Sequence, residues 1–163
     1  MITFKKLQIA NSLSEETMAY TADVYWEGRP LGHIRNDGNG GFSIFHMAGK
    51  AQKADYQAAL AFAKTQKQDL GEGYGMVPFD HLEDYIDHVA GQEGDRQSAG
   101  RWLARTMKTK TVLLADGKIY TCKAKWEGDT ARIEQQLKAR HPGAVILNPL
   151  PKEEAIAKYL SAA

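Results

Sequence analysis

The sequence contains very little cysteine: Cys122 is the only one among 163 residues. An intrachain disulfide therefore cannot form, and a reducing cytosol is the expected compartment. Long apolar runs are also missing, since no stretch approaches the roughly 20 apolar residues that a membrane-spanning helix needs. Residues 1–6 have too few consecutive apolar side chains for a signal peptide. We expect a cytoplasmic protein that is neither exported nor held in a membrane.

A large net charge of either sign is absent too, because 21 basic and 20 acidic side chains leave a formal charge of +1. This balance excludes the overall basic excess of many nucleic-acid-binding proteins and the acidity of a DNA mimic. The sequence also lacks a motif specific enough to name a reaction, so we favour a protein that is not an enzyme and predict no cofactor. Cys122 lies on the apolar face of its predicted strand and is expected to be an inert core thiol.

What the sequence does contain is a series of apolar patterns that predict an α+β fold. Alternating apolar residues predict strands over 2–9, 18–27, 31–35 and 42–47, the first with a bulge at residues 5–6. Short turns between them predict an antiparallel meander, whose apolar face must be covered. A helix over residues 50–67, with no Gly or Pro after Gly49, is the expected cover.

The C-terminal half is predicted to mix helices with a β-hairpin. One helix begins near Asp80 and ends before Gly91, and a second runs over about 96–107. Asp116-Gly117 predicts a two-residue hairpin turn between strands 111–115 and 118–126.

The strand over 118–126 is followed by a helix after Asp129 and by a strand over 144–147. They predict a crossover unit, right-handed if its two strands are parallel neighbours. A last helix follows Pro151. The glycines of 71–75 are the best candidate boundary, and we expect one domain with two lobes, about 1–70 and 76–163.

The stretch Asn-Asp-Gly-Asn-Gly-Gly at 36–41 predicts an elaborate hairpin tip. A phosphate-binding P-loop is excluded because the glycines lead into a strand and no Gly-Lys-Ser/Thr follows. A calcium loop is excluded because the third acidic residue and the distal glutamate are missing. Two interpretations stay open, a structural turn and a projecting loop that contacts a partner.

Charged residues are segregated along the chain, with eight acidic and no basic residues in 68–95, then eight basic residues and one acidic residue in 96–126. Both blocks can simply face solvent or each other. If they lie on separate surfaces, the acidic block can receive a basic protein partner. The candidate partner-binding residues are therefore Asn36, Asp37 and Asn39 of the tip with Asp84 and Asp87 of the acidic block. The alternative, a nucleic-acid-binding surface, places Arg101, Arg105 and Lys108 on one helical face and Lys123 and Lys125 on one strand face.

A third alternative is a metal-dependent enzyme. His81, Asp84 and His88 stand at i, i+3 and i+7 of the predicted helix, a spacing that can direct three ligands to one edge. The competing interpretation is a solvated acidic helix edge, since the His-Glu-x-x-His spacing of metallohydrolases is not present. His33 and His46 flank the tip on adjoining strands and are predicted to lie near one another.

Two stretches resemble small uncharacterised proteins of phages, plasmids and their bacterial hosts. Residues 19–28, Ala-Tyr-Thr-Ala-Asp-Val-Tyr-Trp-Glu-Gly, match the aromatic-rich strand of that group, and residues 32–41 match its Asn-Asp-Gly-x-Gly-Gly tip. The closing Ile-Leu-Asn-Pro-Leu-Pro-Lys-Glu-Glu-Ala at 146–155 is similar as well. The resemblance implies a non-catalytic accessory protein of a mobile element that modulates or inhibits a host enzyme or defence complex. It carries over no catalytic residue.

Overall fold

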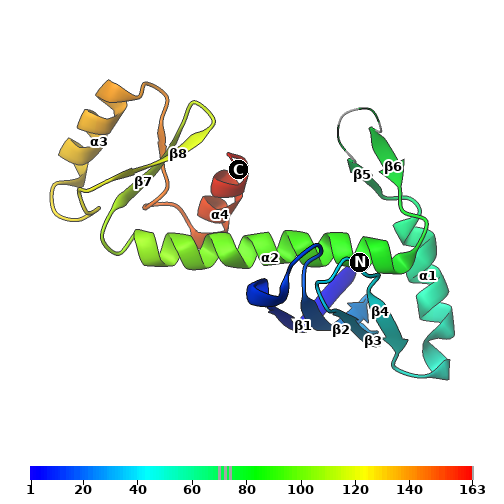
Figure 1. Cartoon of the computed structure of the whole chain (residues 1–163). Helices are drawn as coiled ribbons and strands as arrows, with labels where there is room; N and C mark the ends of the chain where they lie inside the picture. Colours follow the sequence, from blue (N-terminus) through cyan, green and yellow to red (C-terminus); the bar gives the residue numbers. More distant parts are fainter. Residues whose placement is uncertain (70, 72, 74, 163) are drawn as a thin grey trace. The chain divides into compact units, whose positions relative to one another are not determined.

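The computed structural model describes residues 1–69, 71, 73 and 75–162, and its chain divides into two compact units (Figure 1). Unit 1 is Met1–Gln92 and unit 2 is Glu93–Ala163. The division falls inside helix α2, Leu82–Thr106. The predicted joint at 71–75 lies within unit 1, and residues 72 and 74 of it are outside the described residues.

Unit 1 is built on a four-stranded antiparallel sheet in the order β1-β2-β3-β4, which confirms the predicted meander and the α+β class. The strands are β1 Ile2–Ile9, β2 Tyr20–Trp26, β3 Arg29–Asn36 and β4 Ile44–Met47. A short 3₁₀ turn, η1 (Asn11–Leu13), lies between β1 and β2.

Strand β2 shows why the sheet has one buried face. Its Tyr20, Ala22, Val24 and Trp26 are buried, whereas the residues between them are half-buried on the other face. The bulge predicted in β1 is present between Lys5 and Gln8, where the register with β2 shifts.

Two helices cover the buried face of the sheet. Helix α1, Lys53–Ala63, follows the 3₁₀ turn η2 (Lys50–Gln52) and buries Ala59 and Ala63 in the same cluster as Val24. The first part of α2 adds Leu82, Ile86 and Ala90 to that cluster. Figure 1 shows the sheet packed against this part of α2, with α1 beside it.

Helix α1 ends four residues before the predicted limit at Lys67 because the following residues extend into a strand. Strand β5, Lys67–Asp69, pairs antiparallel with β6, Met76–Pro78. Neither strand has the apolar alternation from which a strand is predicted, and the pairing of their backbones is what defines this hairpin.

The prediction of two helices separated by glycine is wrong, because residues 82–106 form the single 25-residue helix α2. A helical glycine costs about 1 kcal/mol relative to alanine. Burial offsets this cost in each unit: Ala90 packs in the core of unit 1, and Ala99 and Leu103 pack in a core of unit 2. Gly100 is itself closely packed, since a Cβ there would lie 3.2 Å from Ile156 Cδ1.

Unit 2 is a three-stranded sheet in the order β8-β7-β9 with helices on both faces. Its elements are β7 Thr111–Ala115, β8 Lys118–Cys122, α3 Thr130–Arg140, β9 Val145–Ile146 and α4 Lys152–Leu160. Residues 112–115 of the central strand β7 are all apolar, as expected for a strand with both faces buried. Val112 packs in one cluster with Ile156 of α4, and Leu113 packs in another with Leu137 of α3.

Two local predictions for unit 2 are confirmed, the hairpin turn at Asp116-Gly117 and the helix after Asp129. Asp116 and Gly117 both have positive φ, 50° and 70°, and join β7 to β8. The carboxylate of Asp129 caps α3 by accepting a hydrogen bond from the Arg132 backbone N–H at 3.0 Å.

The predicted end of the second hairpin strand is wrong, whereas the predicted crossover is present. Strand β8 ends at Cys122, not Trp126, because Cys122 pairs with Thr111, the first residue of β7, and β7 offers no partner beyond it. Strands β8 and β9 both pair antiparallel with β7, so they run parallel to each other, and β8, α3 and β9 form the predicted crossover unit, although β7 lies between its two strands. Within the described residues, no helix combines the length and apolar composition needed to cross a membrane.

The continuity of α2 predicts whether a substitution at Gly91 stabilises or destabilises the protein. Gly91 lies in helical backbone, with open space where a Cβ would be. Gly91→Ala should stabilise the protein by about 0.5–1 kcal/mol, because alanine loses less backbone entropy in a helix. Urea denaturation followed by circular dichroism measures this. Gly100→Ala is the matched control and should gain less stability, since its Cβ would lie 3.2 Å from Ile156 Cδ1. A loss of stability for Gly91→Ala would show that the helix is interrupted there.

Candidate functional site

The candidate site is the tip loop, defined here as residues 36–43, together with the part of α2 beneath it. The loop begins at Asn36, the last residue of β3, and ends just before β4. Gly38 and Gly40 have φ of +87° and +79°, the left-handed region that glycine adopts without strain. Asn36 is only 7% exposed, so a polar side chain lies inside the loop.

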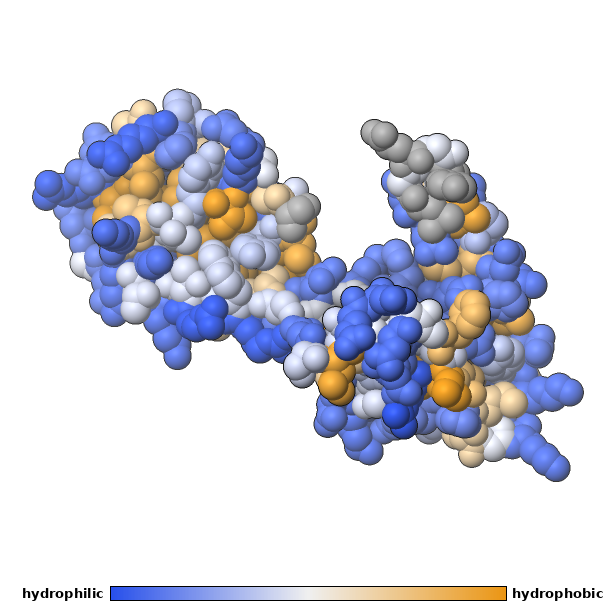
Figure 2. All heavy atoms as spheres, in the orientation of Figure 1, coloured by the Kyte–Doolittle hydropathy of each residue, from blue (hydrophilic) through white to orange (hydrophobic). Residues whose placement is uncertain are grey.

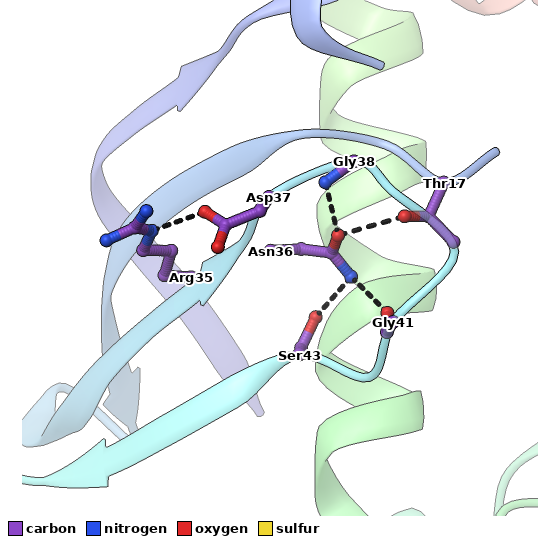
Figure 3. Close-up of polar contacts among 7 residues, drawn as sticks. All are labelled: Thr17, Arg35, Asn36, Asp37, Gly38, Gly41 and Ser43. Carbon is purple, nitrogen blue, oxygen red and sulfur yellow. Dashed lines mark hydrogen bonds and ion pairs between the residues drawn. The ribbon is translucent and has the colours of Figure 1, made fainter. Parts of the chain in front are cut away.

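The Asn36 side chain holds the loop by four hydrogen bonds (Figure 3). Its Nδ2 donates to the Gly41 carbonyl at 3.2 Å and to Ser43 Oγ at 3.0 Å. Its Oδ1 accepts from the Gly38 backbone N–H at 2.8 Å and from Thr17 Oγ1 at 2.9 Å. Both amide protons and both oxygen lone pairs are therefore used, and the loop is folded around one side chain.

Gly38 fixes the same loop to the segment that precedes β2. Its carbonyl accepts hydrogen bonds from the backbone N–H groups of Glu15, Glu16 and Thr17, at 3.0, 3.0 and 3.2 Å. A Cβ at Gly38 would lie 2.2 Å from the Leu13 carbonyl oxygen. Glycine is required here for its φ and for this close approach of two backbones.

Asp87 of α2 joins the loop to the helix and the sheet. Its Oδ1 accepts a hydrogen bond from Ser43 Oγ at 2.6 Å and another from the Tyr20 hydroxyl. Asn36 donates to the same Ser43, so the bonds run from the loop through Ser43 to Asp87 and on to β2.

The pKa values of this pair are shifted by their surroundings. Burial raises the pKa of Asp87, the hydrogen bonds from Ser43 and Tyr20 lower it, and the charges of Asp84 and Glu83 raise it again, with a net rise. Burial, followed by the bond to Asp87, raises the pKa of Tyr20. At neutral pH the tyrosine is therefore a neutral donor to the carboxylate.

A recess of about 410 Å³ opens beside this network. Its lining includes the polar residues Thr17, Tyr20, Asn36 and Asp87 and the apolar residues Met18 and Phe42. Phe42 is 94% exposed, the most exposed large hydrophobic side chain among the described residues. In the view of Figure 2, the surface of unit 1 is mostly hydrophilic, and its hydrophobic areas are small and separate.

The hydroxyl of Ser43 is arranged to support the loop. It is 9% exposed, its proton is donated to Asp87, and it accepts a bond from Asn36. A serine nucleophile needs an accessible oxygen and a base that is free to take its proton. The arrangement holds a loop in one shape, and the recess beside it can accept a polar group together with an apolar stem.

The structure brings Asn36 and Asp87 together through Ser43, although they come from different parts of the sequence. Asp84 lies one turn before Asp87 on α2, half-buried. Asp37 is exposed and accepts a hydrogen bond from Arg35 at 2.5 Å, and Asn39 is exposed.

Sequence reasoning missed Ser43, Tyr20 and Thr17 as members of this site. A signal for Ser43 exists in the alternation of its strand. Phe45 packs on the core, so residue 43, two positions earlier, falls on the same inward face. A polar residue at an inward position requires a hydrogen-bond partner.

The residues of the metal alternative do not form a cluster of ligands. Across residues 1–69, 71, 73 and 75–162, no group of three or more His, Cys, Asp or Glu side chains is arranged to hold a metal ion. His81 precedes α2, while the His88 ring packs against Phe79 and approaches Gln92. His33 and His46 are directly paired across β3 and β4, and His33 contacts Asp23 at 3.1 Å.

The residues of the nucleic-acid alternative all lie in unit 2. Arg101 and Arg105 are on α2, and Lys108 follows the end of that helix. Lys123 and Lys125 were expected on one strand face, which is wrong because β8 ends before them. Lys125 forms an ion pair with Glu127.

Comparison of the chain with protein-family models, curated proteins and solved structures found no match.

The hydrogen bonds of Asn36 predict that neighbouring loop residues differ sharply in their effect on stability. Asn36→Ala should lower the free energy of unfolding by about 2 kcal/mol, because it leaves buried loop groups without partners. Asp37→Ala should change it by less than about 0.5 kcal/mol, because an exposed ion pair contributes little. Chemical denaturation of both variants tests this. Equal effects at the two positions would contradict the proposed role of Asn36.

The raised pKa of Asp87 predicts a pH dependence of stability. An acid whose pKa is higher in the folded than in the unfolded protein binds more protons when folded, so stability falls as pH rises through the folded pKa. Asp87→Asn removes this titration and can still accept both hydroxyl hydrogen bonds. Unfolding free energies between about pH 4 and 8 should show the wild type losing stability relative to Asp87→Asn as pH rises. The opposite slope would contradict the environment described for Asp87.

Proposed function

We propose that this chain is a non-catalytic binding protein whose unit 1 contacts a protein partner through the tip loop and the adjoining start of α2. The observation that carries the proposal is the contrast within the loop. Asn36 is buried and fully hydrogen-bonded, whereas Phe42, six residues on, is 94% exposed. An exposed aromatic ring on a loop held by a rigid support is typical of a contact residue.

The fixed shape of the loop supports this function on energetic grounds. Ordering a mobile loop on association weakens binding, while a loop that is already ordered avoids that loss. Here the ordering is supplied within unit 1 by the bonds of Asn36 and by the three backbone bonds to the Gly38 carbonyl. Exposure of Phe42 leaves its ring free to bury apolar area on a partner.

Charge around the loop favours a partner that is basic as well as apolar. Asp87 lines the recess, and Asp84 and Glu83 lie close enough to raise its pKa. Binding of this kind is steered by charge and weakens with salt. The resemblance to proteins of phages and plasmids favours a host enzyme or a host defence complex as the source of that partner.

Site-specific photo-crosslinking tests the proposal. p-Benzoylphenylalanine in place of Phe42 should give a discrete crosslinked product in a host lysate, since the substituted ring occupies the proposed contact point. The matched control places the same residue at Met76, which is 58% exposed in β6 of the same unit. Phe42→Ala should then lower affinity for the captured protein at least about tenfold without changing stability. Equal crosslinking from both positions would contradict the proposal.

A further inference from the structure

We infer that the recess beside the tip loop binds a primary ammonium group on an aliphatic stem, in the form of a lysine side chain of the protein partner. The source of the lysine rests on the proposed function. The affinity of the recess for an ammonium group is a property of unit 1 alone and can be measured without a partner.

The first observation is a half-buried negative charge without a cation. Asp87 accepts hydrogen bonds from Ser43 and Tyr20, both neutral donors. It takes part in no ion pair within the described part of the chain. Arg35, the basic residue next to the loop, is occupied by Asp37. Charges removed from water are normally paired, so Asp87 is complementary to a cation from outside.

The second observation identifies the oxygen available to that cation. Both bonds to Asp87 end on Oδ1, and no hydrogen bond among the described residues reaches Oδ2. Among those residues, the only fully buried side-chain N or O atom without a partner is Gln52 Oε1. Oδ2 is therefore in contact with solvent. Asp87 is also one of the residues that line the recess.

A second carboxylate lies near the recess and comes from a different segment. A Cβ placed on Gly40 would be 2.2 Å from Glu16 Oε2, so the Glu16 carboxylate lies against a glycine of the recess lining. One acidic residue, Asp87 of α2, therefore lines the recess, and a second, Glu16 of the segment before β2, lies against a glycine of its lining. Their charges add and favour a cation over a neutral ligand.

The free acceptors suit an ammonium better than a guanidinium. An arginine fork needs two carboxylate oxygens side by side, and Oδ1 of Asp87 already accepts two bonds. An ammonium is a compact charge with three rotatable donors. It can donate to Oδ2 of Asp87 from any side and keep its other two donors for water or for backbone carbonyls of the loop. Met18 and Phe42 supply apolar surface for the stem.

The experiment is a titration of the ¹⁵N-labelled full chain followed by two-dimensional NMR, with n-butylammonium chloride as the probe at constant ionic strength. The expected result is a saturable shift of the amide signals of Gly40, Gly41, Phe42 and Gly91. Butan-1-ol has the same size without the charge and should bind at least about tenfold more weakly. n-Butylguanidinium should also bind more weakly. Shifts that grow without saturating, or equal affinity for the alcohol, would overturn the inference.

Substitutions of single acidic residues identify which charge binds the ammonium group. Asp87→Asn keeps the hydroxyl acceptor and should lower butylammonium affinity at least about tenfold, and Glu16→Gln should lower it less. Asp37→Asn removes an exposed acid that already has Arg35 as partner, so its affinity should stay within about twofold of the wild type. Unchanged affinity in Asp87→Asn, with a spectrum as dispersed as that of the wild type, would overturn the assignment.

A second titration, with a lysine-containing peptide, separates this inference from the proposed function. The peptide acetyl-Gly-Lys-Gly-amide should shift the same signals, and its Nε-acetyl-lysine form should not. Butylammonium binding without lysyl-peptide binding would overturn lysine as the source and leave a free amine. If the lysyl peptide binds but crosslinking is equal from positions 42 and 76, the proposed contact through Phe42 is wrong. The inferred binding of an ammonium group in the recess would then still stand.

Discussion

A single carboxylate oxygen, Oδ1 of Asp87, joins the three parts of unit 1 that form its candidate site. It accepts one hydrogen bond from β2 and one from the tip loop, while its own backbone belongs to α2. Because Ser43 in turn accepts from Asn36, the shape of the loop and the position of the helix depend on each other. The two interpretations of the tip, structural turn and contact loop, are therefore not alternatives. The bonds that fold it also hold Phe42 in an exposed position.

The parts of the fold that were predictable from sequence are those set by neighbouring residues. The period of two in β2, the positive φ of Asp116-Gly117 and the cap at Asp129 each need only a few adjacent side chains. The meander follows because short turns leave consecutive strands no other simple pairing. For the site, this reasoning selected Asn36 and Asp87, but as members of two unrelated groups.

What could not be predicted depends on contacts between distant residues. Tyr20 and Asp87 are 67 positions apart, and Ser43 and Asp87 are 44 apart, so no local pattern joins them. The glycines of α2 led to the wrong prediction of two separate helices for the same reason. Their intrinsic cost argues for a break, and only burial on the cores of both units shows that the helix continues. Strands β5 and β6 lack apolar alternation and exist through their pairing alone.

The overall charge of +1 conceals the most informative electrostatic feature of unit 1. Acidic residues dominate the part of the sequence that includes the start of α2, and Asp87 remains half-buried with neutral donors alone, so burial raises its pKa. An asparagine could accept the same two hydrogen bonds without the desolvation cost of a charge. A carboxylate accepts these bonds more strongly than an amide does, but an amide would be enough to connect the loop to the helix. What the carboxylate does add is a negative charge on a residue that lines the recess, and this charge is the basis for the proposed binding of a cation.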